Sequence, residues 1–167
     1  GDMGIGNFIM FTPMLRALRN HFDRAEIVAL FLKGRGADVV AHRLDSVDRC
    51  IVLTLPKEPG ATRFPALARQ LRDQGIHRPD VVVGRFNGSS YLPLLTALWR
   101  APWRVGHVAS AGYRPFSDAP FNLRATMRLD QHEVDRNLDL ARLLGAPVDG
   151  LAVEFPFTAA EAEAAEA

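Results

Sequence analysis

The chain has 167 residues, of which 48% are hydrophobic and 23% are charged, and its formal net charge is +1. This is the length of one ordinary domain, and the composition is that of a globular protein rather than a membrane-spanning one. The near-neutral charge, with no cluster of Lys and Arg, argues against nucleic acid as a partner. A single cysteine excludes an internal disulfide framework, and without a secretory signal pattern we expect a cytoplasmic setting.

The chain opens with GDMGIGNFIMFTPMLRALRNHF, in which glycines precede an apolar stripe at helical spacing. We expect one helix from about Phe8 to His21, with Asn7 as its N-cap. Pro13 would remove the bond to the Ile9 carbonyl and kink this helix. In the alternative, Thr12 is the cap and Pro13 is the first helical position. Because a strand normally precedes such a turn, we also expect a first strand ahead of this segment.

Strand-like and helix-like segments alternate along the rest of the chain. This alternation predicts an α/β fold with a Rossmann-like parallel sheet and helices on both faces. An irregular stretch over 109–122 is long enough for a functional loop. The predicted strands are 25–32, 49–55, 80–86, 103–108, 125–130 and 151–155, and the predicted later helices are 37–43, 64–75, 89–100 and 131–145.

The last predicted helix begins at Thr158. Glu161 follows three residues later, which is the spacing of a capping box. We therefore expect one domain over residues 1–157 and, over 158–167, the start of a linker helix toward a C-terminal domain outside this chain.

Gly4 and Gly6 begin the pattern of a dinucleotide-binding loop, G-x-G-x-x-G, but Ile9 stands where the third glycine is required. The Gly-Lys-Ser/Thr of a phosphate-binding P-loop is also absent. The loop still leads into a helix N-terminus, whose backbone N–H groups suit an anion or a sugar hydroxyl. A purely structural tight turn would have the same spacing, so the residues alone leave both interpretations open.

Four segments share, in order, the patterns of one known family. The opening GIGNFIMFTPMLRALRNHF is similar to a Gly-x-Gly-Asp, Thr-Pro and Leu-Arg-Ala-Leu pattern. PDVVVGRFNGSSYLPLL and WRVGHV follow, and HEVDRNLDLARLLG is close to a His-x-Val-x-Arg-Asn helix. With these segments, which span nearly the whole chain, the sequence resembles the heptosyltransferase family, glycosyltransferase family 9.

This resemblance implies the N-terminal, acceptor-side half of a two-domain GT-B enzyme. Such enzymes transfer a sugar from a nucleotide donor, typically ADP-heptose, to the core of lipopolysaccharide, with inversion and without a metal. The implied partners are a nucleotide sugar and a lipid-linked saccharide at the inner face of the cytoplasmic membrane, where the protein would make peripheral contact. No cofactor besides the nucleotide-sugar substrate is implied, and this chain alone would be inactive.

Inverting transfer needs a base that takes a proton from the acceptor hydroxyl. The family pattern has an aspartate directly after Gly-x-Gly, where this chain has Asn7. An amide cannot take up that proton at neutral pH, although it can orient a hydroxyl. Nearby alternatives are Asp2, His132 and Glu133, of which His132 has the most suitable intrinsic pKa. The candidate catalytic positions are therefore Asn7 and His132, although His132 could instead contact the backbone at a helix start.

Candidate acceptor-binding residues lie in the opening loop and after the ends of predicted strands, where ligands of open α/β sheets bind. An arginine there suits a phosphorylated sugar or a carboxylate, and a tyrosine suits stacking on a sugar. Turn, cap and surface-packing roles would account for the same residues. The candidates are Gly4, Gly6, Arg85, Asn87, Gly88, Ser89, Tyr113 and Arg114.

The residues leave other interpretations open. One is a non-catalytic sugar-binding relative that kept the fold and lost the base, and another is a generic doubly wound nucleotide-binding domain. The lone Cys50 lies in the apolar run RCIVLTL, which favours a buried inert thiol over a nucleophile.

Overall fold

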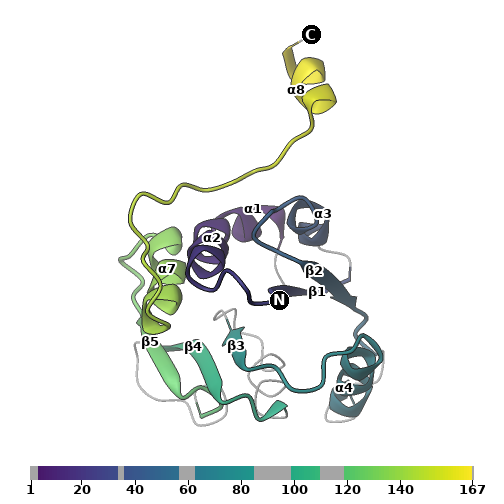
Figure 1. Cartoon of the computed structure of the whole chain (residues 1–167), viewed down its shortest axis with the longest axis vertical. Coiled ribbons are helices and arrows are strands. Elements are labelled where there is room, and N and C mark those ends of the chain that lie inside the picture. The colour runs from purple at the N-terminus through teal and green to yellow at the C-terminus, as the bar shows by residue number, and fades with distance from the viewer. Residues whose placement is uncertain (1–3, 34–35, 57–62, 85–98, 110–118, 167) are drawn as a thin grey trace.

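The computed structural model describes residues 4–33, 36–56, 63–84, 99–109 and 119–166. Short helices and strands alternate through these ranges, as the sequence predicted (Figure 1). The elements are α1 (Ile5–Ile9), α2 (Thr12–His21), β1 (Val28–Leu32), α3 (Ala37–Ala41), β2 (Arg49–Leu53), α4 (Arg63–Asp73), β3 (Val81–Gly84), β4 (Trp103–Ala109), β5 (Leu123–Met127), α7 (Glu133–Leu143) and α8 (Ala159–Glu166).

Every strand pair in the described part of the chain is parallel, which confirms the predicted α/β class. The strands form two sheets, with the orders β1-β2 and β3-β4-β5. One hydrophobic core contains side chains from β1 and from all three strands of the second sheet, so the two sheets share it. The additional strand expected ahead of the opening loop stays a prediction.

Side chains of β1 alternate between two hydrophobic clusters, as the period of two along a strand requires. Phe31 packs into the larger cluster with α1, α2, α3 and α7, and its ring meets that of Phe8 edge to face at a centroid distance of 5.2 Å. Leu30 and Leu32 pack on the other side with Leu71 of α4. Helices therefore cover both faces of this sheet (Figure 1).

The opening segment forms two helices, so the expected single kinked helix is wrong. Gly4, not Asn7, is the N-cap of α1, and α2 begins at Thr12 with Pro13 in its first turn. Pro13 has no N–H to donate to the Ile9 carbonyl, as predicted, and the Thr12 hydroxyl donates to that carbonyl instead, at 2.8 Å. The chain therefore breaks where the proline removes a helical hydrogen bond.

The expected strand over 151–155 is also wrong, because this segment has no strand assignment and pairs with no described strand. It belongs to residues 149–158, here called the connector, which link α7 to α8 (Figure 1). The capping box at the end of the connector is confirmed: the Thr158 N–H donates to Glu161 at 2.7 Å, and the Glu161 N–H donates to the Thr158 hydroxyl at 3.2 Å. Most of the helix expected over 89–100 and of the loop over 109–122 lies outside the described residues.

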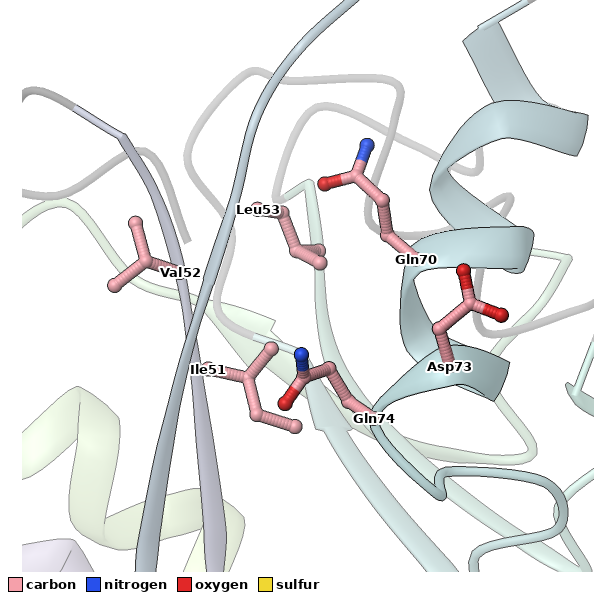
Figure 2. A pocket seen from close by; sticks show the side chains of 6 residues that line it. All are labelled: Ile51, Val52, Leu53, Gln70, Asp73 and Gln74. Atoms are coloured by element: carbon pink, nitrogen blue, oxygen red, sulfur yellow. The ribbon is translucent and has the colours of Figure 1, made fainter.

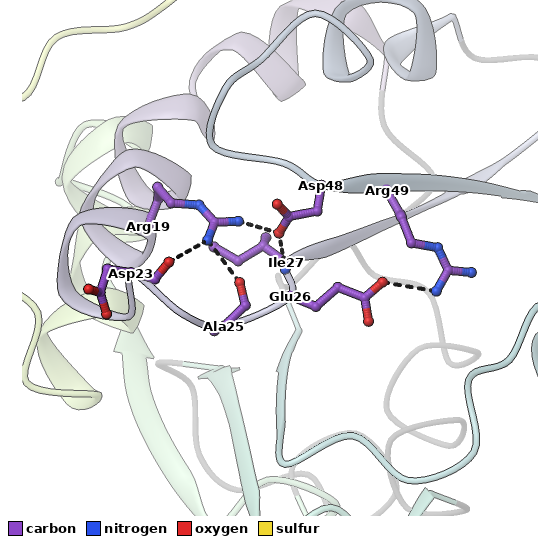
Figure 3. Close-up of polar contacts among 7 residues, drawn as sticks. All are labelled: Arg19, Asp23, Ala25, Glu26, Ile27, Asp48 and Arg49. Atoms are coloured by element: carbon purple, nitrogen blue, oxygen red, sulfur yellow. Dashed lines mark hydrogen bonds and ion pairs between the residues drawn. The ribbon is translucent and has the colours of Figure 1, made fainter.

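At the amino end of the β1-β2 sheet, Arg19 of α2 joins the chain segments that enter the two strands (Figure 3). Its guanidinium pairs with Asp48 and donates to the Ala25 carbonyl at 2.8 Å. The Ile27 N–H donates to Asp48 at 2.6 Å, and this bond together with Arg19 holds the pKa of the Asp48 carboxyl below its ordinary value. This network stabilises the fold. It lies at the amino ends of β1 and β2, away from their carboxyl ends.

Gly106 of β4 lies directly under an aromatic ring. A Cβ atom at this position would be 2.5 Å from ring carbons of Phe121, whose side chain is only 3% exposed and so cannot swing away. The glycine of WRVGHV is therefore required by packing. The neighbouring Arg104 likewise bonds to backbone, with its Nε donating to the Pro120 carbonyl at 2.6 Å.

Gly106→Ala is expected to lower the free energy of unfolding by about 1–3 kcal/mol, because the added methyl group overlaps the Phe121 ring. The measurement is urea unfolding, with Phe121→Leu as a second background. The cost of Gly106→Ala should fall by about 1 kcal/mol or more when Phe121 is leucine. Equal costs in both backgrounds would show that the ring is not the obstacle.

Candidate functional site

The carboxyl ends of parallel strands gather at one edge of a sheet, and the predicted site residues follow these ends. Arg85 follows directly on β3, which ends at Gly84. Tyr113 lies in the segment after β4, and His132 lies between β5 and α7. Because β3, β4 and β5 are parallel, their carboxyl ends lie at one edge of the sheet, and the gathering of the site residues there stays a prediction.

Most of the candidate acceptor contacts cannot be placed individually. Six of them lie outside the described residues, so their predicted roles stay predictions. They are Arg85, Asn87, Gly88, Ser89, Tyr113 and Arg114. The alternative base Asp2 also lies outside the described ranges.

The opening loop joins this edge through the segment that follows β1. Gly4 forms an antiparallel bridge with Gly36, the N-cap of α3. Gly36 has φ +74°, and the Ile5 side chain lies 3.4 Å from where its Cβ would be. The left-handed conformation explains this glycine. The starts of α1 and α3 therefore lie side by side.

Gly4 and Gly6 are not explained in that way. Gly4 has φ −74°, neither glycine has a positive φ, and no described atom lies within 4 Å of the Cβ that either would carry. Both are exposed, as is Asn7 between Gly6 and the buried Phe8. The backbone at the start of α1 is thus open to solvent, which is the geometry that lets a ligand approach N–H groups closely.

Helix α7 runs beside α2 in the same direction. The Asn137 side chain of α7 contacts Met10 just ahead of α2, and Gly145, just after α7, lies near His21 at the end of α2. The starts of both helices consequently point to the same end of the molecule. His132, the N-cap of α7, lies at this end, and α1, which contains Asn7, directly precedes α2.

Asn137 itself has a structural role that the sequence reasoning missed. Its side chain is 1% exposed, and its amide donates to the Met10 carbonyl at 2.9 Å. That carbonyl lies in the break between α1 and α2. The sequence does place an asparagine at a buried position of the HEVDRN helix, which indicates that its amide has a partner. That partner lies 127 residues away in the chain, so the sequence does not identify it.

His132 is the N-cap of α7. Its Nδ1 atom accepts the Val134 N–H at 3.3 Å, and the side chain is exposed. In this tautomer the proton of a neutral ring lies on Nε2, so the lone pair that a base needs is already used by the cap. The geometry therefore favours the backbone contact over catalysis.

Glu133 and Arg136 lie on the first turn of α7, with 3.9 Å between a carboxylate oxygen and a guanidinium nitrogen. Both side chains are about one-fifth exposed. The backbone carbonyl of Arg136 accepts the Nε2–H of the buried His107 from β4, at 2.8 Å. His107 therefore ties α7 to β4. Glu133 supplies the carboxylate of the ion pair with Arg136 on the first turn of α7.

A separate open hollow of about 150 Å³ lies between β2 and α4, lined by Ile51, Val52, Leu53, Gln70, Asp73 and Gln74 (Figure 2). Gln70 pairs with the peptide group of Thr54, because its amide oxygen accepts the Thr54 N–H and its amide nitrogen donates to the Thr54 carbonyl, both at 2.9 Å. Of the predicted site residues that the structure describes, none lines this hollow.

The described residues provide no obvious metal site and no membrane span. Within the ranges that the structure describes, no three His, Cys, Asp or Glu side chains gather as metal ligands would. In the same ranges, no helix is both long enough and apolar enough to cross a membrane.

Parallel sheets with helices on both faces define the protein as a Rossmann-like α/β fold. No protein-family model and no curated protein matches the chain. Among solved structures it is similar to a family 9 glycosyl transferase from Veillonella parvula, with TM-score 0.70 and 18% identity over 94% of this chain and 44% of that one.

It is also similar to E. coli heptosyltransferase WaaC. The WaaC structure with ADP gives TM-score 0.70 and 15% identity over 92% of this chain and 48% of that one. The WaaC structure with ADP-2-deoxy-2-fluoro heptose gives TM-score 0.64 and 14% identity over 92% and 49%. The chain therefore has the fold of part of these glycosyltransferases, and it spans about half their length.

Cys50 is expected to react slowly with alkylating reagents in the folded protein. Partial burial, and secondarily the charge of Asp38, raise the pKa of its thiol from 9.0 to about 11. At about pH 8 the thiolate fraction is then about one hundredfold smaller than in the unfolded chain. Iodoacetamide labelling followed by mass spectrometry, with and without urea, measures this. The folded rate should rise with pH up to about 11, and equal rates in both states would contradict the assignment.

Proposed function

We propose that this chain is the acceptor-side half of a glycosyltransferase. It would serve inverting transfer of a heptose-like sugar from a nucleotide donor such as ADP-heptose to a lipopolysaccharide core or related lipid-linked saccharide. The observation that carries this proposal is the likeness of fold to the glycosyltransferase structures, one of which holds ADP and another an ADP-heptose analogue. The donor-binding half would follow α8, and the reaction would need no metal.

The open start of α1 supports the placement of the acceptor. Neither backbone conformation nor a close described neighbour accounts for Gly4 and Gly6. N–H groups at a helix start bind sugar hydroxyls and anions well, and the exposed Asn7 amide can both donate and accept there. The loops after β3 and β4, with Arg85 and Tyr113, would complete the acceptor site.

The site would act at the inner face of the cytoplasmic membrane, where lipid-linked saccharides are accessible to a peripheral protein. Arg85 and Arg114 would pair with acidic or phosphorylated groups of the acceptor, for which a guanidinium fork is well suited. No residue of this proposal depends on a cofactor.

Asn7 favours a second candidate, a sugar-binding relative that has lost catalysis. An amide at the base position orients a hydroxyl without taking its proton. The N-cap contact of His132, whose Nδ1 accepts the Val134 N–H, supports this candidate, because that nitrogen is less available as a base. Of the alternatives Asp2, His132 and Glu133, Glu133 is the carboxylate that lies in the described residues, on the first turn of α7.

Gly6→Ala is expected to weaken binding of a deacylated, heptose-free lipopolysaccharide core oligosaccharide by about tenfold. The new methyl group would project into open space, where the acceptor approaches. It should leave stability unchanged or raise it by about 0.5–1 kcal/mol, since alanine is the better helix former. Calorimetric titration of the 167-residue chain measures the affinity, with Asn20→Ala on the exposed face of α2 as the control. Binding of NAD or a free nucleotide in place of the oligosaccharide would favour a generic nucleotide-binding domain.

Asn7→Asp separates the enzyme from the non-catalytic relative. In a longer protein that joins this chain to its donor-binding half, a restored carboxylate should raise consumption of the nucleotide sugar by about one hundredfold. Activity that is indifferent to Asn7 but abolished in His132→Ala would place the base at His132. The enzyme proposal fails when no form consumes any nucleotide sugar.

A further inference from the structure

The break between α1 and α2 is held by side chains from two remote parts of the chain. Pro13 has no N–H for the Ile9 carbonyl. The Thr12 hydroxyl donates to the Ile9 carbonyl at 2.8 Å, and Asn137 donates to the Met10 carbonyl at 2.9 Å. Thr12 and Asn137 are 0% and 1% exposed, so both donors lie in the interior, where an unpaired polar group is costly.

Thr12 also receives a hydrogen bond from the connector. The Glu154 N–H donates to the Thr12 hydroxyl oxygen at 2.8 Å. The hydroxyl therefore donates toward α1 and accepts from the connector at the same time, which uses its one proton and one of its lone pairs. This single buried oxygen joins α1, α2 and the connector.

The Glu154 side chain fixes the connector at the same point. Its carboxylate accepts from both Nε and Nη2 of Arg16, at 2.6 Å and 2.9 Å. Such a two-pronged pair is directional, and each side chain is only about 30% exposed. The connector is consequently tied to the first two turns of α2 by its backbone and by its side chain.

We propose that Thr12 is a positioning residue that couples the connector to the orientation of α1. When the connector is seated on α2, the hydroxyl is held in the direction that satisfies the Ile9 carbonyl, and α1 keeps its angle to α2. When the connector leaves, the hydroxyl loses its N–H donor and is free to rotate. α1 carries Gly4, Gly6 and Asn7, so movement of the connector changes the loop that the proposed function assigns to the acceptor.

The coupling rests on the proposed function only for its biological meaning. In structural terms, the coupling links Glu154 to the hydrogen bonds of α1. In these bonds the Phe8 and Met10 N–H groups donate to the carbonyls of Gly4 and Gly6, at 3.1 Å and 3.3 Å. That link is measurable without substrate.

The test is amide hydrogen exchange of the 167-residue chain, read at Phe8 and Met10 and referred to the amide of the buried Leu71 in α4. Thr12→Val keeps the shape but removes the hydroxyl, and Glu154→Ala removes the ion pair with Arg16 that seats the connector while keeping the residue 154 N–H. Both should speed exchange at Phe8 and Met10 by about fivefold relative to Leu71. Thr12→Ser, which keeps the hydroxyl, should change this ratio by less than about twofold.

Asp130→Ala is the matched control, because it breaks an ion pair of similar length, to Arg128, elsewhere on the surface. It should leave the ratio unchanged. Equal acceleration of Phe8, Met10 and Leu71 in Thr12→Val and Glu154→Ala would show a general loss of stability and overturn the proposal. Should Thr12→Val not fold, Glu154→Ala decides alone, because it removes only the carboxylate that pairs with Arg16 and leaves the buried Thr12 in place. Loss of oligosaccharide binding with an unchanged exchange pattern would count against the proposed function only.

Discussion

One hydrogen bond, from the amide of the buried Asn137 to the Met10 carbonyl, ties the break between the opening helices to α7. Leaving a buried amide such as that of Asn137 unpaired costs about 1–3 kcal/mol. Pro13 removes the helical donor of the Ile9 carbonyl, and the side chains of Thr12 and Asn137 supply donors at the break. The Thr-Pro segment and the HEVDRN helix are therefore parts of one structural unit, although they are far apart in the sequence.

The α/β class and most element positions were predictable from the sequence, because apolar runs bounded by turn residues indicate which short segments are buried. The sequence did not reveal that the opening helix is broken in two, and the backbone dihedral angles at the break explain why. Met10 and Phe11 both keep right-handed helical conformation, with φ of −68° and −95°, so the apolar stripe keeps its phase through the break. Periodicity alone cannot detect a break of this kind.

The strand expected over 151–155 failed for a different reason. A period of two shows only that alternate residues face different surroundings. Here Glu154 faces α2 and bonds to Arg16, while Val153 and Phe155 are about half exposed. The alternation comes from an extended segment laid on a helix, and no described strand pairs with it.

For the site, the sequence predicts ligands at the carboxyl ends of the strands, which stays a prediction, and it did not show which residues are committed to structure. His132 caps a helix, His107 ties β4 to α7, and Asn137 holds the opening break. Each of these polar residues has a partner that only the folded chain brings near. Gly4 and Gly6 are the opposite case, since the structure shows no described conformational or packing need for them.

The pairing of Gln70 with Thr54 has a consequence for the protein in a crowded solution. β2 is the last strand of its sheet in the described residues, and such a strand presents peptide groups that can recruit a strand from another molecule. Gln70 presents an amide to Thr54 as a neighbouring strand would, with one donor and one acceptor. A single side chain of α4 thus occupies the hydrogen-bonding groups of Thr54 just past the end of β2, so a strand added there would first have to displace Gln70.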